Sequence, residues 1–210
     1  MRNSIDLDIH KIKNSKVFLL EKTMMEWGER YYPSARYNSL EKKDIKDFLF
    51  YYTGNADRII NGALRDSQNI DKLFSYELFT KETYIRVLEE IENASVPEDI
   101  IVYRKIGRYL FDNMLEWSKV NHIRKGSIIF DKGFLSTSLS YRVARDIKHL
   151  GKDIMATIYV PKGTKGIYLG NLTNLKEYEM LFLPETKLKV LSFSRVFHRI
   201  VCMVVNPVIE

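Results

Sequence analysis

The chain has 210 residues, 45% of them hydrophobic and 12% aromatic, which is enough to bury the core of one globular domain spanning residues 1–210. Its 33 basic and 27 acidic residues are interspersed, so the net charge of +6 indicates solvated helix faces and argues against nucleic-acid binding. No stretch approaches the roughly 18 apolar residues of a membrane span, no signal peptide is visible at the amino terminus, and the single cysteine, Cys202, excludes an internal disulfide.

Apolar residues at helical spacing dominate residues 1–96, which we expect to form a mainly helical portion. A first long helix that ends near Gly28 is predicted, with a buried stripe formed by Val17, Leu20, Met24 and Trp27. Three further helical segments are predicted: one capped by Ser39 with the stripe Ile45, Phe48, Leu49 and Tyr52, one at residues 59–65, and one with the stripe Tyr84, Val87, Leu88 and Ile91. Each stripe predicts one buried helix face.

From Pro97 onward the pattern favours strands, so residues 97–210 are expected to form a mainly β portion. A short apolar run at 100–103 predicts a buried strand with Arg104 at its end. A helix through Leu110, Met114 and Trp117 is expected next, and further strands are expected at residues 134–138, 154–160, 167–169, 178–183, 188–193 and 200–205. Helices first and strands afterwards indicate an α+β domain with mostly antiparallel pairing.

Two acids, Glu177 and Glu179, stand one residue apart at the start of an apolar strand. Because side chains at i and i+2 project from the same face of an extended chain, both carboxylates are predicted to point into one cleft. A Glu-x-Glu pair, an arginine at a strand end or a Ser-Thr-Ser run is, taken alone, commonly a surface feature. Their joint occurrence, each at a predicted strand, favours a catalytic site instead.

The order of Arg104, Ser-Thr-Ser at residues 136–138 and Glu-x-Glu at 177–179 resembles the Arg / Ser-Thr-Ser / Glu-x-Glu pattern of bacterial mono-ADP-ribosyltransferase toxins. The resemblance extends to clostridial binary toxins and vegetative-insecticidal-type toxins at residues 26–28, 39–41, 51–54, 60–65 and 160–169. It implies a helical N-terminal portion packed on a mostly antiparallel split β-sandwich with a central cleft for NAD. NAD would be the substrate, and no metal is expected.

The resemblance also implies a role for each matched residue. Glu179 would stabilise the positive charge that develops on the nicotinamide ribose, as in glycoside hydrolysis, and Ser136 would orient Glu179. Arg104 would bind a phosphate of NAD through forked hydrogen bonds, with Lys105 adding positive charge. The remaining positions expected at the NAD site are Thr137 and Ser138 on the strand, and Tyr52, Asn61 and Arg65 on the helical side.

Glu177 bears on which amino acid of the target protein accepts the ADP-ribose. An arginine guanidinium has a pKa above about 12, so a nucleophilic nitrogen needs a base or an oriented anion beside it. In the resembling toxins a Glu at this position accompanies arginine modification and a Gln accompanies asparagine modification, which predicts an arginine acceptor in a host protein, with actin as the implied target. Secretion or delivery into the host cytosol, and a separate translocation component, are implied as well. Two alternatives stay open: an NAD glycohydrolase, and an inactive binding module of the same fold.

Two segments depart from the family pattern. Where relatives have a Phe that stacks on nicotinamide, followed by an Arg, this chain has His149 and Lys152. The loop at residues 170–176 lacks the aromatic residue that often helps grip the target protein. We expect both departures to affect affinity and target choice more than the chemistry.

Overall fold

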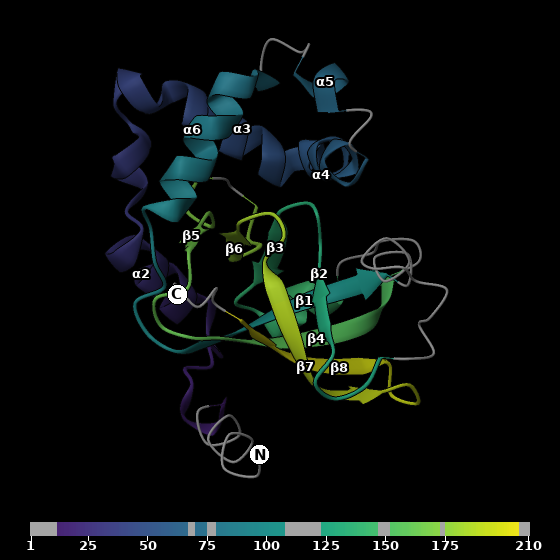
Figure 1. Ribbon diagram of the computed structural model, residues 1–210. Coiled ribbons are helices and arrows are strands. Elements are labelled where there is room, and N and C mark those ends of the chain that lie inside the picture. The colour runs from purple at the N-terminus through teal and green to yellow at the C-terminus, as the bar shows by residue number, and fades with distance from the viewer. Residues whose placement is uncertain are drawn as a thin grey trace.

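Most helices precede the strands in sequence, and the helices between residues 40 and 92 lie together at one end of the sheet (Figure 1). The computed structural model describes residues 12–66, 70–74, 79–107, 123–146, 152–172 and 175–205. Its helical elements are α2 (Glu21–Tyr31), η1 (Ser34–Tyr37), η2 (Leu40–Lys42), α3 (Lys43–Tyr51), η3 (Tyr52–Ala56), α4 (Asp57–Arg65), α5 (Ile70–Leu73), α6 (Lys81–Glu92) and α8 (Tyr141–Asp146). Its strands are β1 (Ile100–Gly107), β2 (Ile128–Phe130), β3 (Leu135–Ser138), β4 (Lys152–Val160), β5 (Gly166–Tyr168), β6 (Glu179–Phe182), β7 (Lys187–Ser194) and β8 (Arg199–Val204).

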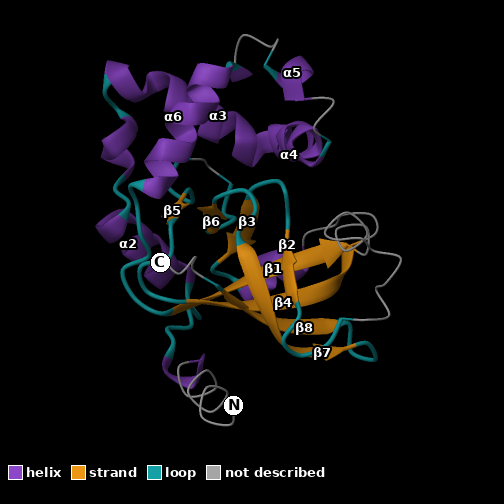
Figure 2. Cartoon of the chain, viewed as in Figure 1, coloured by secondary structure: helices purple, strands orange, loops and turns teal. Residues whose placement is uncertain are grey.

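The described strands form one eight-stranded sheet in the order β2-β7-β8-β4-β1-β3-β6-β5 (Figure 2). Only the β4–β8 pairing is parallel among them, and the other neighbours are antiparallel. The junction between β1 and β3 consists of a single register pair, Tyr103 with Ser138. The sheet is therefore split there into a β5-β6-β3 part and a larger part, and the predicted α+β class with mostly antiparallel strands is confirmed.

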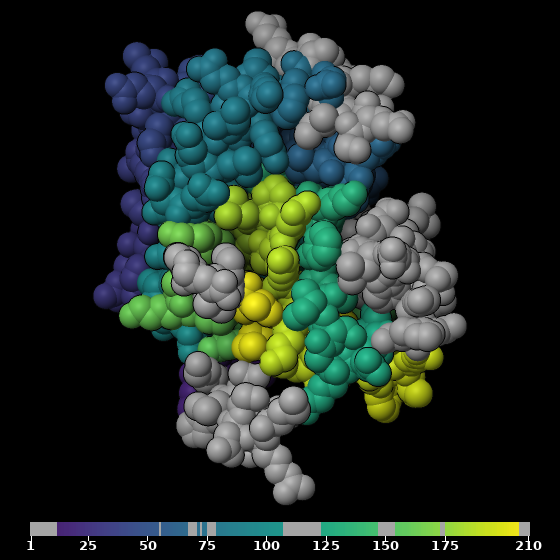
Figure 3. Space-filling model, in the orientation of Figure 1, coloured from purple at the N-terminus to yellow at the C-terminus, as the bar shows by residue number. Residues whose placement is uncertain are grey.

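The helical portion packs onto the β3–β6 part of the sheet, as the space-filling view also shows (Figure 3). The predicted α3 stripe is confirmed, because Ile45, Phe48, Leu49 and Tyr52 are all buried. Phe134, directly before β3, contacts the rings of Phe48, Tyr52 and Tyr84 edge to face, at centroid distances of 6.5, 5.5 and 6.0 Å. Edge-to-face contacts of this kind add to the energy of burial. This aromatic cluster fixes the helices relative to the strand that carries Ser136.

The first helix differs from its prediction. It begins at Glu21 and ends at Tyr31, and Val17 and Leu20 are 47% and 65% exposed. The reason is that the preceding backbone is extended, so that Lys16 forms a parallel bridge with Ile100 at the start of β1. Gly28 lies inside the helix and does not end it.

Several other predictions need correction or concern residues outside the described part of the chain. Arg104 lies within β1 and not at its end, and β2 was not predicted. The Ser39 side chain makes no capping hydrogen bond, because a 3₁₀ turn precedes α3. The helix expected through 110–117 and the residue His149 lie outside the described residues, and Lys152 is described only as the backbone start of β4.

Candidate functional site

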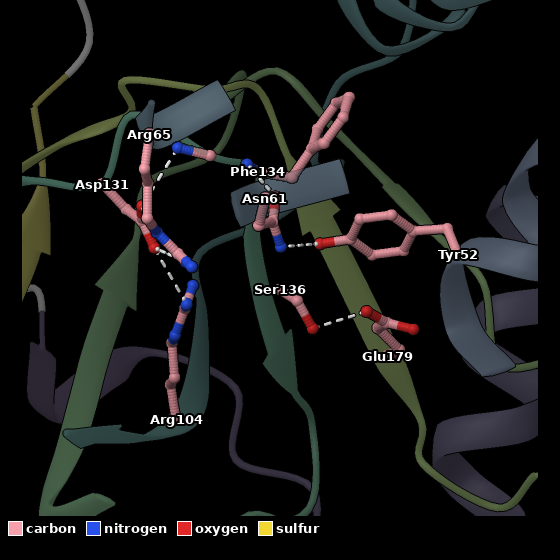
Figure 4. Close-up of polar contacts among 9 residues, drawn as sticks. Tyr52, Asn61, Arg65, Arg104, Asp131, Phe134, Ser136 and Glu179 are labelled. Carbon is pink, nitrogen blue, oxygen red and sulfur yellow. Dashed lines mark hydrogen bonds and ion pairs between the residues drawn. The ribbon is translucent and has the colours of Figure 1, made fainter. Parts of the chain in front are cut away.

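Ser136 and Glu179 meet across β3 and β6 (Figure 4). In the register of these strands Ser136 lies opposite Leu181, so Glu179 is its diagonal neighbour on the same face. The Ser136 hydroxyl donates to Oε1 of Glu179 at 2.5 Å. The Glu179 side chain is therefore held in one orientation by the strand that precedes it in the sheet.

Glu179 is buried, with 5% of its surface exposed. The pKa of its carboxyl is raised to about 8, mainly by burial; the hydrogen bond from Ser136 and the charge of Arg104 oppose this shift, and the negative charges of Glu177 and Asp57 add to it. Oε2 has no hydrogen-bond partner among the described residues. The free protein thus holds this carboxyl mostly protonated at neutral pH, with one oxygen available to a ligand.

Glu177 reaches the site by a turn and not by strand alternation, which corrects the predicted geometry. Strand β6 begins only at Glu179, and Tyr178 between the two acids has a left-handed backbone with φ of 49°. The Ser138 hydroxyl donates to the Glu177 carbonyl at 2.5 Å, and Leu139 N–H donates to the Tyr178 carbonyl at 3.0 Å. Burial and then the charge of Asp57 raise the pKa of Glu177. The charge of Glu177 acts on Glu179, so the structure places the two acids near each other, with Ser138 fixing the turn.

A second polar cluster joins Arg65 and Arg104 through Asp131 (Figure 4). Arg65 donates from Nε and Nη2 to the two carboxylate oxygens at 2.8 and 2.7 Å, and Arg104 donates from Nη2 to Oδ2 at 3.1 Å. The Gly133 N–H donates to Oδ1 at 3.0 Å. Burial would raise the pKa of Asp131, but the hydrogen bonds and charges of the two arginines outweigh it and hold the pKa below its usual value. One carboxylate thus positions both guanidinium groups.

Tyr52 and Asn61 connect the helices to the site through β3. The Asn61 amide donates to the Tyr52 hydroxyl at 2.9 Å and accepts the Phe134 N–H at 2.8 Å. Tyr52 is fully buried, and burial, followed by the charge of Glu179, raises the pKa of its hydroxyl. Their contact with NAD stays a prediction, whereas the described contacts give both residues a positioning role.

Lys105 and Thr137 point away from the Ser136–Glu179 contact. Adjacent residues of a strand project to opposite faces, so Lys105 lies on the other side of β1 from Arg104. Its ammonium donates to the Arg145 carbonyl of α8 at 3.3 Å. The Thr137 hydroxyl donates to the Met180 carbonyl at 3.1 Å. The structure therefore does not bring Lys105 to the other predicted phosphate ligand.

The chemistry of the site fits a dinucleotide. Arg104 is 9% exposed, and its Nη1 has no hydrogen-bond partner among the described residues. A buried cationic donor without a partner suits a phosphate oxygen, and the unpaired Glu179 oxygen suits a ribose hydroxyl or a developing positive charge. The described parts of the chain contain no group of three or more His, Cys, Asp or Glu side chains that could hold a metal ion.

Asp131 is a residue of the candidate site that was not predicted from the sequence. Its partners Arg65 and Arg104 lie 66 and 27 positions away, so no local pattern links them. The available signal was an acid two residues before Gly133, in the turn that leads into the Ser-Thr-Ser strand. Asp is common in such turns for local reasons, which is why the signal alone carries little weight.

Comparisons with known proteins bear on the family and the fold of this chain. Residues 24–202 match the model of a family described as ADP-ribosyltransferase exoenzyme. The mono(ADP-ribosyl)transferase SpvB of Salmonella typhimurium is 31% identical over 182 residues, a match that covers 76% of this chain and 29% of SpvB. The NAD(+)–arginine ADP-ribosyltransferase EFV of Enterococcus faecalis is 27% identical over 146 residues, covering 66% of this chain and 26% of that protein. The chain therefore spans less than a third of the length of either relative.

A solved structure gives the same architecture. The Clostridium limosum C3 exoenzyme superposes with a TM-score of 0.69 at 21% identity, and the superposition covers 93% of this chain and 100% of the exoenzyme. At this identity the likeness bears on the fold alone. It confirms the fold class expected from the sequence. Among the described residues, no helix is both long and apolar enough to cross a membrane.

Proposed function

The chain belongs to the ADP-ribosyltransferase exoenzyme family, and on that premise we propose that it is a mono-ADP-ribosyltransferase that uses NAD as substrate and modifies an arginine of a host protein. The observation that carries the proposal is the Ser136–Glu179 contact, in which a buried carboxyl keeps one oxygen unpaired. The unpaired Nη1 of Arg104 supports it by supplying a cationic donor for the diphosphate.

Glu179 has the central chemical role in this proposal. As the bond between ribose and nicotinamide breaks, the electron pair leaves with nicotinamide and positive charge develops on the ribose. A deprotonated Glu179 stabilises that charge, and it does so strongly because the site is buried. Binding of a cationic pyridinium ring favours the deprotonated form, which lowers the pKa of Glu179 from its value in the free protein.

Glu177 has its role in the second half of the reaction. Its carboxylate orients the incoming guanidinium and accepts its proton as the new bond to ribose forms. The products are ADP-ribosyl-arginine, nicotinamide and one proton. The name of the Enterococcus faecalis relative supports an arginine acceptor, and the Glu at position 177 supports it independently.

We expect Glu177→Ala to reduce transfer to an arginine acceptor by about 100-fold or more while NAD hydrolysis stays within about five-fold of the wild type. The reason is that Glu177 acts on the acceptor and Glu179 acts on the ribose. Transfer of labelled ADP-ribose to agmatine, a small guanidinium compound, and release of nicotinamide without acceptor measure the two activities. Glu26→Ala, on the exposed side of α2, is the control. Equal loss of both activities would contradict this division of roles.

The pH dependence of NAD cleavage should reveal the raised pKa of the buried Glu179 carboxyl. We expect kcat/KM for NAD to rise with pH through an apparent pKa near 8, since Glu179 must lose its proton before it can stabilise a cation. Because the charge of Glu177 raises the pKa of Glu179, Glu177→Gln should move this limb to lower pH. Initial rates of nicotinamide release between pH 5 and 10 test this, and an unchanged limb in Glu177→Gln would contradict it.

The target and route are proposed from the family resemblance. We take actin as the candidate acceptor, and secretion or delivery into the host cytosol, with a separate translocation component, as the route. Labelled NAD incubated with purified actin and with host-cell lysate tests the target, and mass spectrometry identifies the modified residue. Label on a discrete protein supports transfer, whereas free ADP-ribose alone supports the alternative of an NAD glycohydrolase.

A further inference from the structure

Helix α2 packs against the base of the loop that leads to Glu177. Figure 1 shows α2 next to β5, and the rings of Trp27 and Tyr168 meet edge to face at 6.2 Å. A Cβ atom at Gly28 would lie 2.0 Å from Tyr168 Cε1, and one at Gly170 would lie 2.3 Å from the Tyr168 hydroxyl. Tyr168 is therefore packed tightly between α2 and the first residue of the loop.

Two acids of α2 extend this contact along the loop. Glu29 Oε2 accepts a hydrogen bond from the Asn171 amide at 2.7 Å, and Glu21 Oε2 lies 3.8 Å from the Lys176 ammonium. The two acids are eight residues apart, which is about two helical turns, so they share one face of α2. Asn171 and Lys176, the residue before Glu177, thus both contact this face of α2.

The Asn171–Glu29 contact is the stronger of the two. Both contacts are exposed, but a charge-assisted hydrogen bond of 2.7 Å contributes more than an ion pair of 3.8 Å. The Lys176 and Glu21 side chains are 76% and 64% exposed, so their pair contributes little. At the far end of the loop, Ser138 holds the Glu177 carbonyl.

We propose that Glu29 is a positioning residue: it holds Asn171, at the start of the loop, against α2, so that Glu177 six residues further on stays beside Glu179 for attack by the acceptor. The inference rests on the proposed transferase function. Loosening the loop costs the acceptor step alone, because Glu179 is held separately by Ser136 in the sheet. Glu29 therefore affects transfer and not the breaking of the nicotinamide bond.

The test uses Glu29→Ala, Asn171→Ala and the double variant, with Glu26→Ala as a matched control. Glu26 is on the same helix with the same charge, and it lies 3.7 Å from Lys22 of α2 itself. The Asn171 variant is needed because Glu29 also accepts the Ser34 N–H at 3.3 Å. Each protein is assayed for transfer to agmatine and for NAD hydrolysis, and hydrogen–deuterium exchange is followed in peptides covering residues 169–178.

We expect both single variants to lower transfer by about 3- to 10-fold, with hydrolysis within about two-fold, and the double variant to be no worse than either single one. Exchange in the 169–178 peptides should be faster in these variants and unchanged in Glu26→Ala. Three results would overturn the positioning role but leave the proposed function intact. They are a double variant whose loss of transfer is the product of the two single losses, a loss of NAD hydrolysis that parallels the loss of transfer, and a Glu29→Ala variant that transfers ADP-ribose as fast as an active wild type. A wild type that does not modify agmatine would overturn the proposed function and, with it, this role.

Discussion

Glu179→Gln is expected to lower both transfer and NAD hydrolysis by at least about 1,000-fold. The amide keeps the size of the side chain and can still accept the Ser136 hydroxyl, but it carries no negative charge to stabilise the ribosyl cation. Glu179→Ala should abolish both activities in the same way. Nicotinamide release and labelling of agmatine measure the loss. An activity within ten-fold of the wild type would remove Glu179 from the proposed mechanism.

The same substitution should stabilise the protein. The pKa of Glu179 is raised from its ordinary value near 4.5 to about 8 in the folded state, so its favourable contribution is complete below pH 4.5 and is lost as pH rises through 8. Gln does not titrate, so we expect Glu179→Gln to have the same Tm as the wild type at pH 5. Near pH 9 its Tm should be several degrees higher, which corresponds to a gain of about 1–4 kcal/mol in the free energy of unfolding. Differential scanning calorimetry at both pH values provides the check, and an equal Tm at pH 9 would contradict the burial argument.

Asp131→Asn is expected to have the second large effect. The residue is 4% exposed and its carboxylate neutralises two guanidinium groups, so its loss removes the counter-charge of the buried Arg104 guanidinium. Breaking a buried ion pair from one side costs about 3–5 kcal/mol, which corresponds to a decrease of about 6–20 °C in Tm for a chain of this size. KM for NAD should also rise by about 10-fold, since Arg104 loses the anchor that fixes its orientation.

A control and a pH series separate this effect from a general loss of charge. Asp47→Asn removes an acid that pairs with Lys43 on the exposed face of α3, and it should change Tm by less than about 2 °C. The lowered pKa of Asp131 means that its stabilisation is present above pH 4 and is lost as pH falls toward the folded-state pKa. The Tm gap between wild type and Asp131→Asn should therefore narrow below pH 4. A gap that is constant with pH would argue against the ion-pair explanation.

The sequence by itself determined the fold class and the order of the functional elements. Periods of 3.6 residues in the α3 stripe and of two in β4 depend only on which faces must be buried, and burial is the dominant energy of folding. The Arg, Ser-Thr-Ser and Glu-x-Glu segments could be found because each is contiguous along the chain. Helix limits were less predictable, as the start of α2 shows, because Lys16 pairs with a strand more than 80 residues away.

The tertiary structure alone decided how these segments act together. A turn with a left-handed Tyr178, fixed by Ser138, brings Glu177 to Glu179, whereas strand alternation had been expected to do so. Asp131 pairs with two arginines because the fold places α4, β1 and the turn after β2 side by side, which the sequence does not show. The physical reason is that hydrogen bonds and ion pairs act over about 3 Å in space and are indifferent to separation along the chain, so contacts between distant residues leave no periodic trace in the sequence.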